Sequence, residues 1–276
     1  MTKHKTKFDE IGPWSEVKLE IIRKYAAAYT AILSKKKFKF FYIDGFAGAG
    51  THVSKTTGEL VPGSPLNALR VSPPFQHYYL IDSSGSRISS LEKQIGNRED
   101  VTLRRGDCND VLLTEIFPLV RYEHYERALC LLDPYGLHLN WEVMRQAGQM
   151  RTIDLFLNFP TMDMNMNALH RRPGTAEREQ IARMNAFWGD ESWRDVAYRP
   201  ASQEDLFGDP ELQKVPMDEI ANAFRTRLRK VAGFKHVPKP VPMRNSTNAI
   251  VYYLFFASHQ PVADDIVTQI FSRYGR

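Results

Sequence analysis

Long apolar runs, cysteine and a strong excess of charge are all scarce in this sequence of 276 residues. No run of about 18 apolar residues occurs, which excludes a membrane-spanning helix. The N-terminus, Met-Thr-Lys-His-Lys-Thr-Lys, lacks the apolar stretch of a secretory signal. The two cysteines, Cys108 and Cys130, are too few for a disulfide scaffold or a four-thiolate zinc site. We therefore expect a cytoplasmic protein with reduced cysteines, no bound metal and no membrane attachment.

The overall composition is that of an ordinary globular protein. Hydrophobic residues make up 43% of the chain and charged residues 25%, which excludes wholesale disorder and a coiled coil. The 37 basic and 32 acidic side chains give a formal net charge of +5, which permits a nucleic-acid partner without requiring one. The length suits one α/β domain with an insertion.

Strand-like and helix-like segments alternate through the first part of the chain. Nearly continuous apolar runs, typical of strands covered on both faces, occur at residues 38–43, 77–81, 101–103, 127–132 and 153–157. Helical spacing of apolar residues occurs before and between them, at residues 14–32, 65–71, 87–95, 111–117 and 141–150. This alternation predicts a parallel sheet with helices on both faces.

The alternation stops after Pro160. Residues 161–240 contain no strand-like run and predict helices near 177–187 and 217–231, whereas residues 249–257 give the strongest strand signal of the sequence. The predicted divisions are residues 1–160 for an N-terminal helix and the main part of the α/β domain, 161–240 for a helical insertion, and 241–276 for the final strands and helix of the α/β domain.

A glycine-rich turn, Ile43-Asp-Gly-Phe-Ala-Gly-Ala-Gly50, directly follows the first predicted strand. Gly48 and Gly50 allow a tight turn and let a ligand approach the backbone closely. The dinucleotide fingerprint G-x-G-x-x-G is not met, because the third residue after Gly50 is Val53. A purely structural turn gives the same pattern, so the loop alone is a weak signal.

Acidic residues follow the next three strands as well. Asp82, Asp107 and Asp133 each come just after a strand, at the edge of an open α/β sheet where ligands bind. An acid in the position of Asp82 accepts hydrogen bonds from ribose hydroxyls in doubly wound folds. A helix cap explains Asp107 or Asp110 equally well. Four acids in order, counting Asp44, favour a ligand site over separate caps.

The series resembles the motifs of class I methyltransferases that use S-adenosylmethionine. The fuller pattern is similar to the family of three-Cys-motif partner proteins, and it comprises Tyr42-Ile-Asp-Gly-Phe-Ala-Gly-Ala-Gly50, Gly63-Ser-Pro65, Leu132-Asp-Pro-Tyr-Gly136, Asn158-Phe-Pro160, Arg244-Asn-Ser-Thr-Asn248 and Tyr252-Tyr-Leu-Phe-Phe-Ala-Ser258. The resemblance covers nearly the whole chain. It implies a doubly wound, mostly parallel seven-stranded sheet, a class I methyltransferase-like Rossmann fold with a helical insertion. It also implies a three-Cys-motif protein as partner.

The resemblance also assigns residues to S-adenosylmethionine. Its methionine part would be surrounded by the glycine-rich turn, namely Asp44, Gly45, Phe46, Ala47, Gly48 and Gly50. Asp82 would bind the ribose, with Ser83 beside the adenine. Asp107 would bind the adenine amino group, with a second contact from the Cys108 backbone. Carboxylates near the cationic sulfur would stabilise its positive charge.

Asp133-Pro134-Tyr135 resembles the D-P-P-Y motif of amino-methyltransferases. In that chemistry the Asp oxygen and the Pro carbonyl accept hydrogen bonds from the target amine while the aromatic ring stacks on the base, which must first leave its helix. The second proline is missing and Gly136 follows, so a tight turn explains the motif too, and both explanations can hold together. Asn158 either orients a substrate or caps the following segment. We predict N-methylation of a nucleic-acid base or a similar planar amine. The alternative is a cofactor-binding or degenerate module that serves a separate metalloenzyme.

Two further patterns bear on the substrate. Cytosine C5 methylation needs a nucleophilic cysteine after the fourth strand, and residues 133–136 contain none. A strip of basic residues in the insertion, free of acids, would suit the phosphates of a nucleic acid, and its members are Arg225, Arg227, Arg229, Lys230, Lys235 and Lys239. The solvated face of a helix explains this strip equally well.

Overall fold

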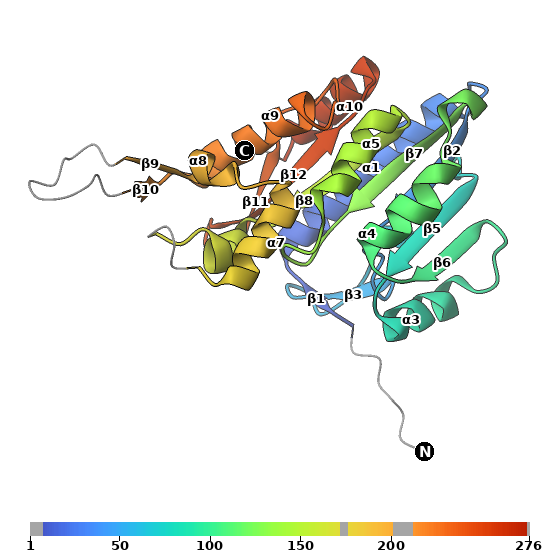
Figure 1. Cartoon of the computed structure of the whole chain (residues 1–276). Helices are drawn as coiled ribbons and strands as arrows, with labels where there is room; N and C mark the ends of the chain where they lie inside the picture. The colour runs from blue at the N-terminus through green and yellow to red at the C-terminus, as the bar shows by residue number, and fades with distance from the viewer. Residues whose placement is uncertain (1–7, 172–175, 201–211, 275–276) are drawn as a thin grey trace, which may run out of the picture.

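The computed structural model describes residues 8–171, 176–200 and 212–274, and its centre is a seven-stranded sheet (Figure 1). The strands are β2 (Lys39–Asp44), β5 (His77–Asp82), β6 (Val101–Arg105), β7 (Glu126–Leu132), β8 (Ile153–Phe159), β11 (Val241–Arg244) and β12 (Ile250–Ala257). Their spatial order is β11-β12-β8-β7-β2-β5-β6, and in this sheet β12 alone runs opposite to the other strands. The predicted doubly wound, mostly parallel seven-stranded sheet is confirmed.

The central strands are apolar along their length because helices cover both faces of the sheet. In β2, Phe40 and Tyr42 enter the hydrophobic cluster on one face, whereas Phe41 and Ile43 enter the cluster on the other. This alternation follows from the two-residue period of a strand. A strand with two buried faces has no polar side, which is why an unbroken apolar run predicted it.

Ten α-helices occur among the described residues, and none of them is long and apolar enough to cross a membrane. They are α1 (Pro13–Leu33), α2 (Ser64–Ala68), α3 (Gly85–Ile95), α4 (Cys108–Val111), α5 (Trp141–Met150), α6 (Thr161–Asp163), α7 (Arg178–Trp188), α8 (Trp193–Ala197), α9 (Met217–Lys230) and α10 (Pro261–Phe271). Short π or 3-10 turns are η1 (Leu112–Ile116), η2 (Phe117–Leu119), η3 (Tyr122–His124) and η4 (Met164–Ala168). Helices α1 and α10 contribute to the core on one face, and α5, α7 and α9 to the core on the other.

Two short sheets were not predicted. Residues 51–62 form the hairpin β3 (Thr51–Ser54) and β4 (Leu60–Pro62), with β1 (Glu10–Ile11) parallel to β3. The predicted insertion, expected to be helical, also holds the antiparallel pair β9 (Tyr198–Pro200) and β10 (Leu212–Lys214). Backbone hydrogen bonds hold these strands, which are too short and too polar to show the apolar alternation that marks a longer strand.

The helices of the predicted insertion pack on the sheet through aromatic rings. The Phe224 ring of α9 lies 4.9 Å from Phe159 of β8, 5.6 Å from Phe255 of β12 and 5.4 Å from Phe187 of α7, between ring centroids. All four rings are buried in one cluster with α5. The insertion therefore shares its core with the sheet. The division of the chain into three parts stays a prediction.

Candidate functional site

The order of the strands reverses at one place along the carboxyl edge of the sheet, and we call this place the crevice. From β2 the chain proceeds outward through β5 and β6 on one side, and it then returns to β7 and β8 on the other side. In open α/β sheets ligands bind where the order reverses, which here is between β2 and β7. Asp44 ends β2 and Asp133 directly follows β7, so the topology brings these two acids to the two sides of the crevice.

The glycines of the loop after β2 have different roles. A Cβ atom on Gly45 would come within 2.7 Å of the Cys108 sulfur, and one on Gly50 within 2.8 Å of Leu91 Cδ1, so packing requires both glycines. Gly48 has φ +66°, and a Cβ built there would meet no atom within 4 Å among the described residues. Gly48 is therefore the glycine that leaves room for a ligand against the backbone. Ala47 is buried in the core and offers only its backbone.

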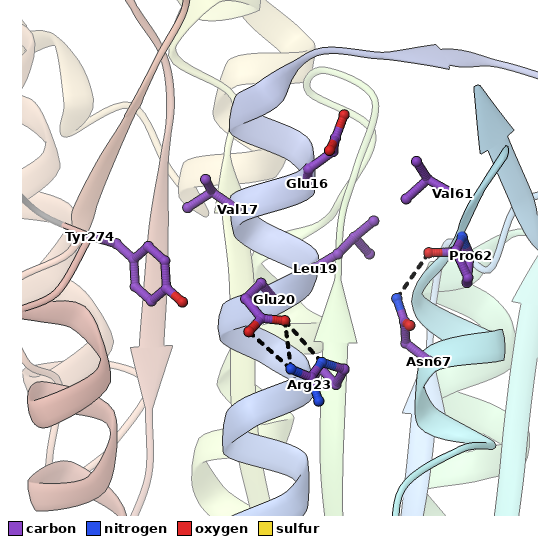
Figure 2. Close-up of a pocket in the computed structure, with 9 residues that line it drawn as sticks. All are labelled: Glu16, Val17, Leu19, Glu20, Arg23, Val61, Pro62, Asn67 and Tyr274. Atoms are coloured by element: carbon purple, nitrogen blue, oxygen red, sulfur yellow. Dashed lines mark hydrogen bonds and ion pairs between the residues drawn. The ribbon is translucent and has the colours of Figure 1, made fainter. Parts of the chain in front are cut away.

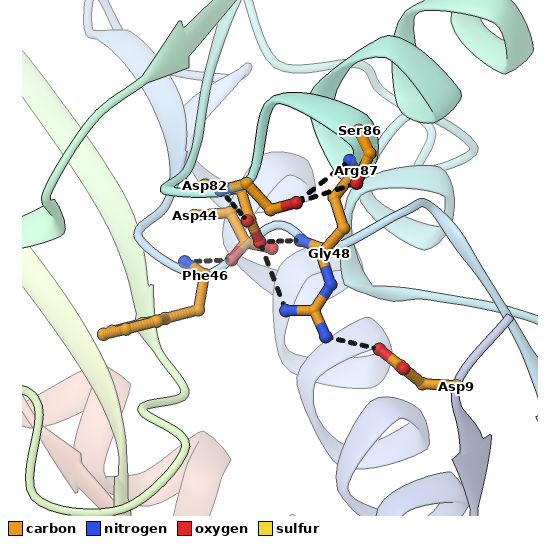
Figure 3. A network of polar contacts seen from close by, with 8 residues as sticks. Asp9, Asp44, Phe46, Gly48, Asp82, Ser86 and Arg87 are labelled. Carbon is orange, nitrogen blue, oxygen red and sulfur yellow. Dashed lines mark hydrogen bonds and ion pairs between the residues drawn. The ribbon is translucent and has the colours of Figure 1, made fainter. Parts of the chain in front are cut away.

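Asp82 holds this loop in position. Its carboxylate accepts a hydrogen bond from the Gly48 amide at 3.0 Å (Figure 3) and another from the Ser84 amide at 2.8 Å. The Arg87 guanidinium lies 3.9 Å from the same carboxylate and pairs with Asp9 at 2.9 Å. Asp82, the predicted ribose-binding residue, is thus buried beneath the Arg87 side chain, which Asp9 holds in place. A ribose that reached Asp82 would compete with Arg87 for it.

Asp44 is a fully buried carboxylate at the floor of the crevice. It accepts hydrogen bonds from the Phe46 amide and the Tyr42 hydroxyl, both at 3.2 Å, and from the Ser64 hydroxyl. The Phe46 ring points away from the carboxylates (Figure 3). Burial, with a smaller contribution from the Asp133 charge, raises the pKa of Asp44 to about 6, because these hydrogen bonds offset only part of the lost hydration. A cation in the crevice would favour the ionised form.

The segment after β6 supplies a helix cap. Asp107 is exposed and accepts a hydrogen bond from the Asn109 amide (2.8 Å) at the start of α4, so the cap interpretation holds for it. Ser83 is exposed next to Asp82, and Asp110 is exposed beyond the cap. The Cys108 side chain is buried, which leaves only its backbone for a ligand. The structure thus places Asp107 and Ser83 at the same edge as Asp82, open to solvent.

A buried lysine that the sequence analysis missed contacts Asp133. The ammonium of Lys18 in α1 donates to Asp133 Oδ2, and the Asn158 amide donates to Oδ1 at 2.8 Å. The Lys18 side chain is only 8% exposed. Burial alone would lower the pKa of Lys18, but the Asp133 carboxylate outweighs burial and the pKa is raised. The signal in the sequence was a lysine four residues after Trp14 and four before Ile22, on the apolar face of the helix.

The turn after β7 is a tight structural turn, and it also exposes an aromatic ring at the candidate site, as the two interpretations of its sequence predicted. Pro134 is buried, Gly136 has φ +87°, and the Leu137 amide donates to Asp163 at 2.8 Å, as in a structural turn. The same turn leaves the Tyr135 ring 94% exposed at the edge of the crevice. Beside it, Asn158 Oδ1 is buried and accepts no hydrogen bond from the described residues. The site therefore offers an exposed ring and an unused acceptor next to Asp133.

The strip at residues 225–239 does not adjoin this crevice. His236 bridges to Ser258, which follows the end of the antiparallel β12, and Ala257 pairs with Leu155 near the start of β8. The distal part of the strip therefore lies at the amino end of the sheet, opposite the crevice. This part of the strip is far from the candidate site because α9 runs along the antiparallel strand away from the carboxyl edge.

Two members of the strip stabilise the fold. Arg225 donates to the Val237 carbonyl at 2.6 Å, and Arg227 donates to the Trp188 carbonyl at 2.7 Å and to Asp190 at 2.6 Å. The remaining members are exposed, and they are Arg229, Lys230, Lys235 and Lys239. These are the residues of the strip that stay free for a partner.

Neither cysteine suits a nucleophile. Cys108 and Cys130 are both buried, and burial raises the pKa of both thiols. A thiolate is the reactive form, so neither residue is activated for attack on a base. Among the described residues, no group of three His, Cys, Asp or Glu side chains is arranged to hold a metal ion.

A separate groove of about 400 Å³ lies along α1 (Figure 2). Its lining residues are Glu16, Val17, Leu19, Glu20, Arg23, Val61, Pro62, Asn67 and Tyr274. Glu16 and Glu20 stand two positions either side of Lys18, which is about 200° around a helix, so the groove faces away from Asp133. None of the predicted site residues lines it. The strand topology, not this groove, locates the candidate site.

No family model matches the sequence, and no curated protein sequence matches it. Among solved structures, protein LPL1258 from Legionella pneumophila is similar with a TM-score of 0.52 and 12% identity, over 93% of this chain and 92% of that chain. A putative S-adenosylmethionine-dependent methyltransferase from Listeria monocytogenes gives a TM-score of 0.44 and 11% identity, over 85% of this chain and 99% of that chain. The N-methyltransferase NodS from Bradyrhizobium japonicum, in complex with S-adenosyl-L-homocysteine, gives a TM-score of 0.42 and 11% identity, over 90% of this chain and 89% of that chain.

At such low identity, a similarity of structure shows the fold alone, and only the first of these three has a TM-score above 0.5. It supports the α/β architecture with the doubly wound sheet. Membership of the three-Cys-motif partner family stays a prediction from the motifs.

Proposed function

We propose that this protein is an S-adenosylmethionine-dependent methyltransferase that methylates the nitrogen of a planar amine, with a nucleic-acid base as the leading substrate class. The crevice between β2 and β7 carries the proposal. There Gly48 leaves its backbone open, and the carboxylates of Asp44 and Asp133 lie near enough for their charges to interact, at the switch point of the sheet. When bound, the cofactor supplies a methyl group already activated on a cationic sulfur, so the protein has mainly to orient and to place charge.

The residues around the crevice fit this cofactor. Asp44, whose pKa of about 6 reflects a poorly compensated buried charge, gains from a positive sulfur nearby. The open backbone at Gly48 receives the methionine part, and Asp82 receives the ribose once Arg87 moves aside. Asp107 and the neighbouring Ser83 stand exposed along the same edge for the adenine.

The surroundings of Asp133 fit a target amine. Lys18 and Asn158 each donate a hydrogen bond to this carboxylate, and together they fix its orientation. A carboxylate offers about four lone-pair positions, so the two donors leave capacity for an N–H of the substrate. Asn158 Oδ1 supplies a further acceptor, and the exposed Tyr135 ring supplies a stacking surface. A substrate amine that donates its two N–H groups to these acceptors would have its nitrogen lone pair directed toward the crevice.

Calorimetry with S-adenosylmethionine and S-adenosylhomocysteine tests the cofactor, and the chain offers a matched pair of variants. Gly48 and Gly58 both have a positive φ and open space where a side-chain methyl group would stand, but Gly58 lies in the β3–β4 turn. We expect Gly48→Ala to weaken binding about tenfold or more and Gly58→Ala to leave it unchanged, since both carry the same backbone cost. Equal affinity in the two variants would refute the cofactor site.

Transfer of a labelled methyl group to single-stranded RNA and DNA tests the reaction. We expect activity in the wild type and its loss in Asp133→Ala, with cofactor affinity retained. The alternative, a cofactor-binding module that serves a separate metalloenzyme, is favoured by one observation: Asp133 already has two donors, Lys18 and Asn158. Binding of the cofactor without transfer to either nucleic acid would support that alternative over the proposed enzyme.

A further inference from the structure

A second surface, at the amino end of the sheet, combines cations with exposed aromatic rings. It is built from the segment before β2 and the segment before β7, which the Lys39 amide joins through a hydrogen bond to the Tyr125 carbonyl at 3.0 Å. We call it the basic-aromatic patch, and its members are Lys35, Lys36, Lys37, Phe38, Lys39, Arg121, Tyr122, Tyr125 and Arg127. None of these residues belongs to the crevice, which lies at the opposite ends of the same strands.

The rings of the patch gather around Arg127, and two of them are open to solvent. The Arg127 guanidinium lies 4.7 Å from the Phe38 ring centroid and 4.6 Å from that of Tyr122, and the Phe38 and Tyr125 rings are 6.2 Å apart. Tyr122 is nevertheless 54% exposed and Tyr125 63% exposed. Guanidinium and aromatic groups thus form one continuous layer whose outer rings have free faces.

Tyr125 is difficult to explain by folding alone. Its φ is +56°, a left-handed conformation that glycine and asparagine adopt readily and bulky residues avoid. A buried ring would compensate for this strain through packing, but the Tyr125 ring is mostly exposed. The ring contacts Phe38 but is otherwise largely exposed, and a strained residue of this kind indicates a binding role.

The charge of the patch is strongly positive. Its six cations face two acids of the same segments, Glu123 and Glu126. Glu126 is buried and already lies within 3.8 Å of Lys39 and 3.6 Å of Arg121. Among the ion pairs of the described residues, none involves the exposed lysines 35–37. These lysines therefore stay available to an anionic partner.

We infer that the basic-aromatic patch binds single-stranded nucleic acid. Phosphates pair with the lysines, and unstacked bases lie on the Tyr122 and Tyr125 rings, the combination that non-sequence-specific single-strand binding uses. An acidic protein would pair with the lysines, but its carboxylates would not stack on the two exposed tyrosine rings. The patch lies one strand length, about 20 Å, from the crevice. It is thus a second binding surface, and it does not depend on the proposed methyl transfer.

Fluorescence anisotropy of the full chain with labelled oligo-dT and oligo-U, each of about 20 nucleotides to exceed one single-strand site, tests this surface without any cofactor. The triple variant Lys35→Ala/Lys36→Ala/Lys37→Ala should bind about tenfold more weakly, and its slope of log affinity against log salt should be about 2 lower, for three lost phosphate contacts. A triple variant of the same charge change, Lys230→Ala/Lys235→Ala/Lys239→Ala, is the matched control and should bind as the wild type does.

The tyrosines separate stacking from charge. Tyr125→Asn, which suits a positive φ, should weaken binding about fivefold at an unchanged salt slope, whereas Tyr122→Phe should bind normally. Circular dichroism checks that each variant is folded. Absence of oligonucleotide binding, equal losses in the two triple variants, or full affinity in Tyr125→Asn would overturn the inference. Equally tight binding of a polyglutamate peptide would overturn it in favour of an acidic protein partner.

Discussion

The buried carboxylate of Asp44 should make the folded protein less stable at neutral pH than its asparagine variant. Its pKa is raised from 3.8 to about 6 by burial. A folded pKa above the unfolded value means that the folded state binds the proton more tightly, so stability falls as pH rises from about 4 to about 6 and then levels off. At 1.36 kcal/mol for each pKa unit, the ionised form costs about 3 kcal/mol above pH 6.

Asp44→Asn removes this cost while it keeps a carbonyl oxygen to accept from the Phe46 amide. At pH 8 we expect the unfolding free energy to rise by up to about 3 kcal/mol, which is on the order of 5 °C in Tm for a chain of this size. Below pH 4 the variant and the wild type should melt alike. Thermal unfolding followed by circular dichroism at pH 4, 6 and 8 measures both effects. A variant that is less stable at pH 8, or a stability difference independent of pH, would refute the reasoning.

The same substitution should weaken a cationic ligand selectively. S-adenosylmethionine carries a positive sulfur and S-adenosylhomocysteine does not, so Asp44→Asn should reduce affinity for the first more than for the second. Asp154 supplies the control, because it too is buried with a raised pKa, and it accepts hydrogen bonds from Tyr25 and Ser258 away from the crevice. Asp154→Asn should leave the ratio of the two affinities unchanged.

Three further outcomes follow from the contacts of the crevice. Lys18→Met should destabilise the fold by about 2 kcal/mol in urea unfolding at pH 7, because it leaves the half-buried Asp133 without its cation, and Lys18→Met/Asp133→Asn should recover most of the loss. Arg87→Ala should raise the affinity for S-adenosylhomocysteine about threefold in calorimetry, because the ribose no longer has to compete with Arg87 for the Asp82 carboxylate. Weaker binding would show instead that Arg87 itself contacts the ligand. Tyr135→Ala should change stability by less than about 0.5 kcal/mol yet raise KM for the acceptor about tenfold.

The strands and the loop after β2 were predictable because each depends on local sequence. A strand with two buried faces must be apolar throughout, and β7 and β8 show this directly. A turn that approaches a ligand needs a residue without a side chain, which Gly48 supplies. The β3–β4 hairpin carries neither signal, because backbone pairing with β1 and not side-chain burial defines it.

The partners of the site residues were not predictable in the same way. The sequence placed Asp133 at the sheet edge, but Lys18 reaches it from 115 residues away. Likewise, the position of Asp82 was foreseen, whereas the Arg87 and Asp9 side chains that cover it meet only in the folded chain. Such long-range pairs depend on how the helices pack and leave little trace in local spacing. The position of the basic strip could not be foreseen for the same reason, since the direction of α9 decides which end of the sheet it occupies.

Asp44 and Tyr125 are two costs to stability that packing does not explain, one at each end of β2. The first is a buried charge and the second a strained backbone under an exposed ring. Departures from local preference of this kind are expected where a residue serves binding. The two sites lie about 20 Å apart along the strand, so their effects should add. The double variant Asp44→Asn/Tyr125→Asn should therefore gain about 4 kcal/mol in unfolding free energy, about 3 from the charge and about 1 from the backbone. It should also bind both the cationic ligand and the oligonucleotide more weakly, and a gain in stability with both affinities unchanged would show that neither residue is kept for binding.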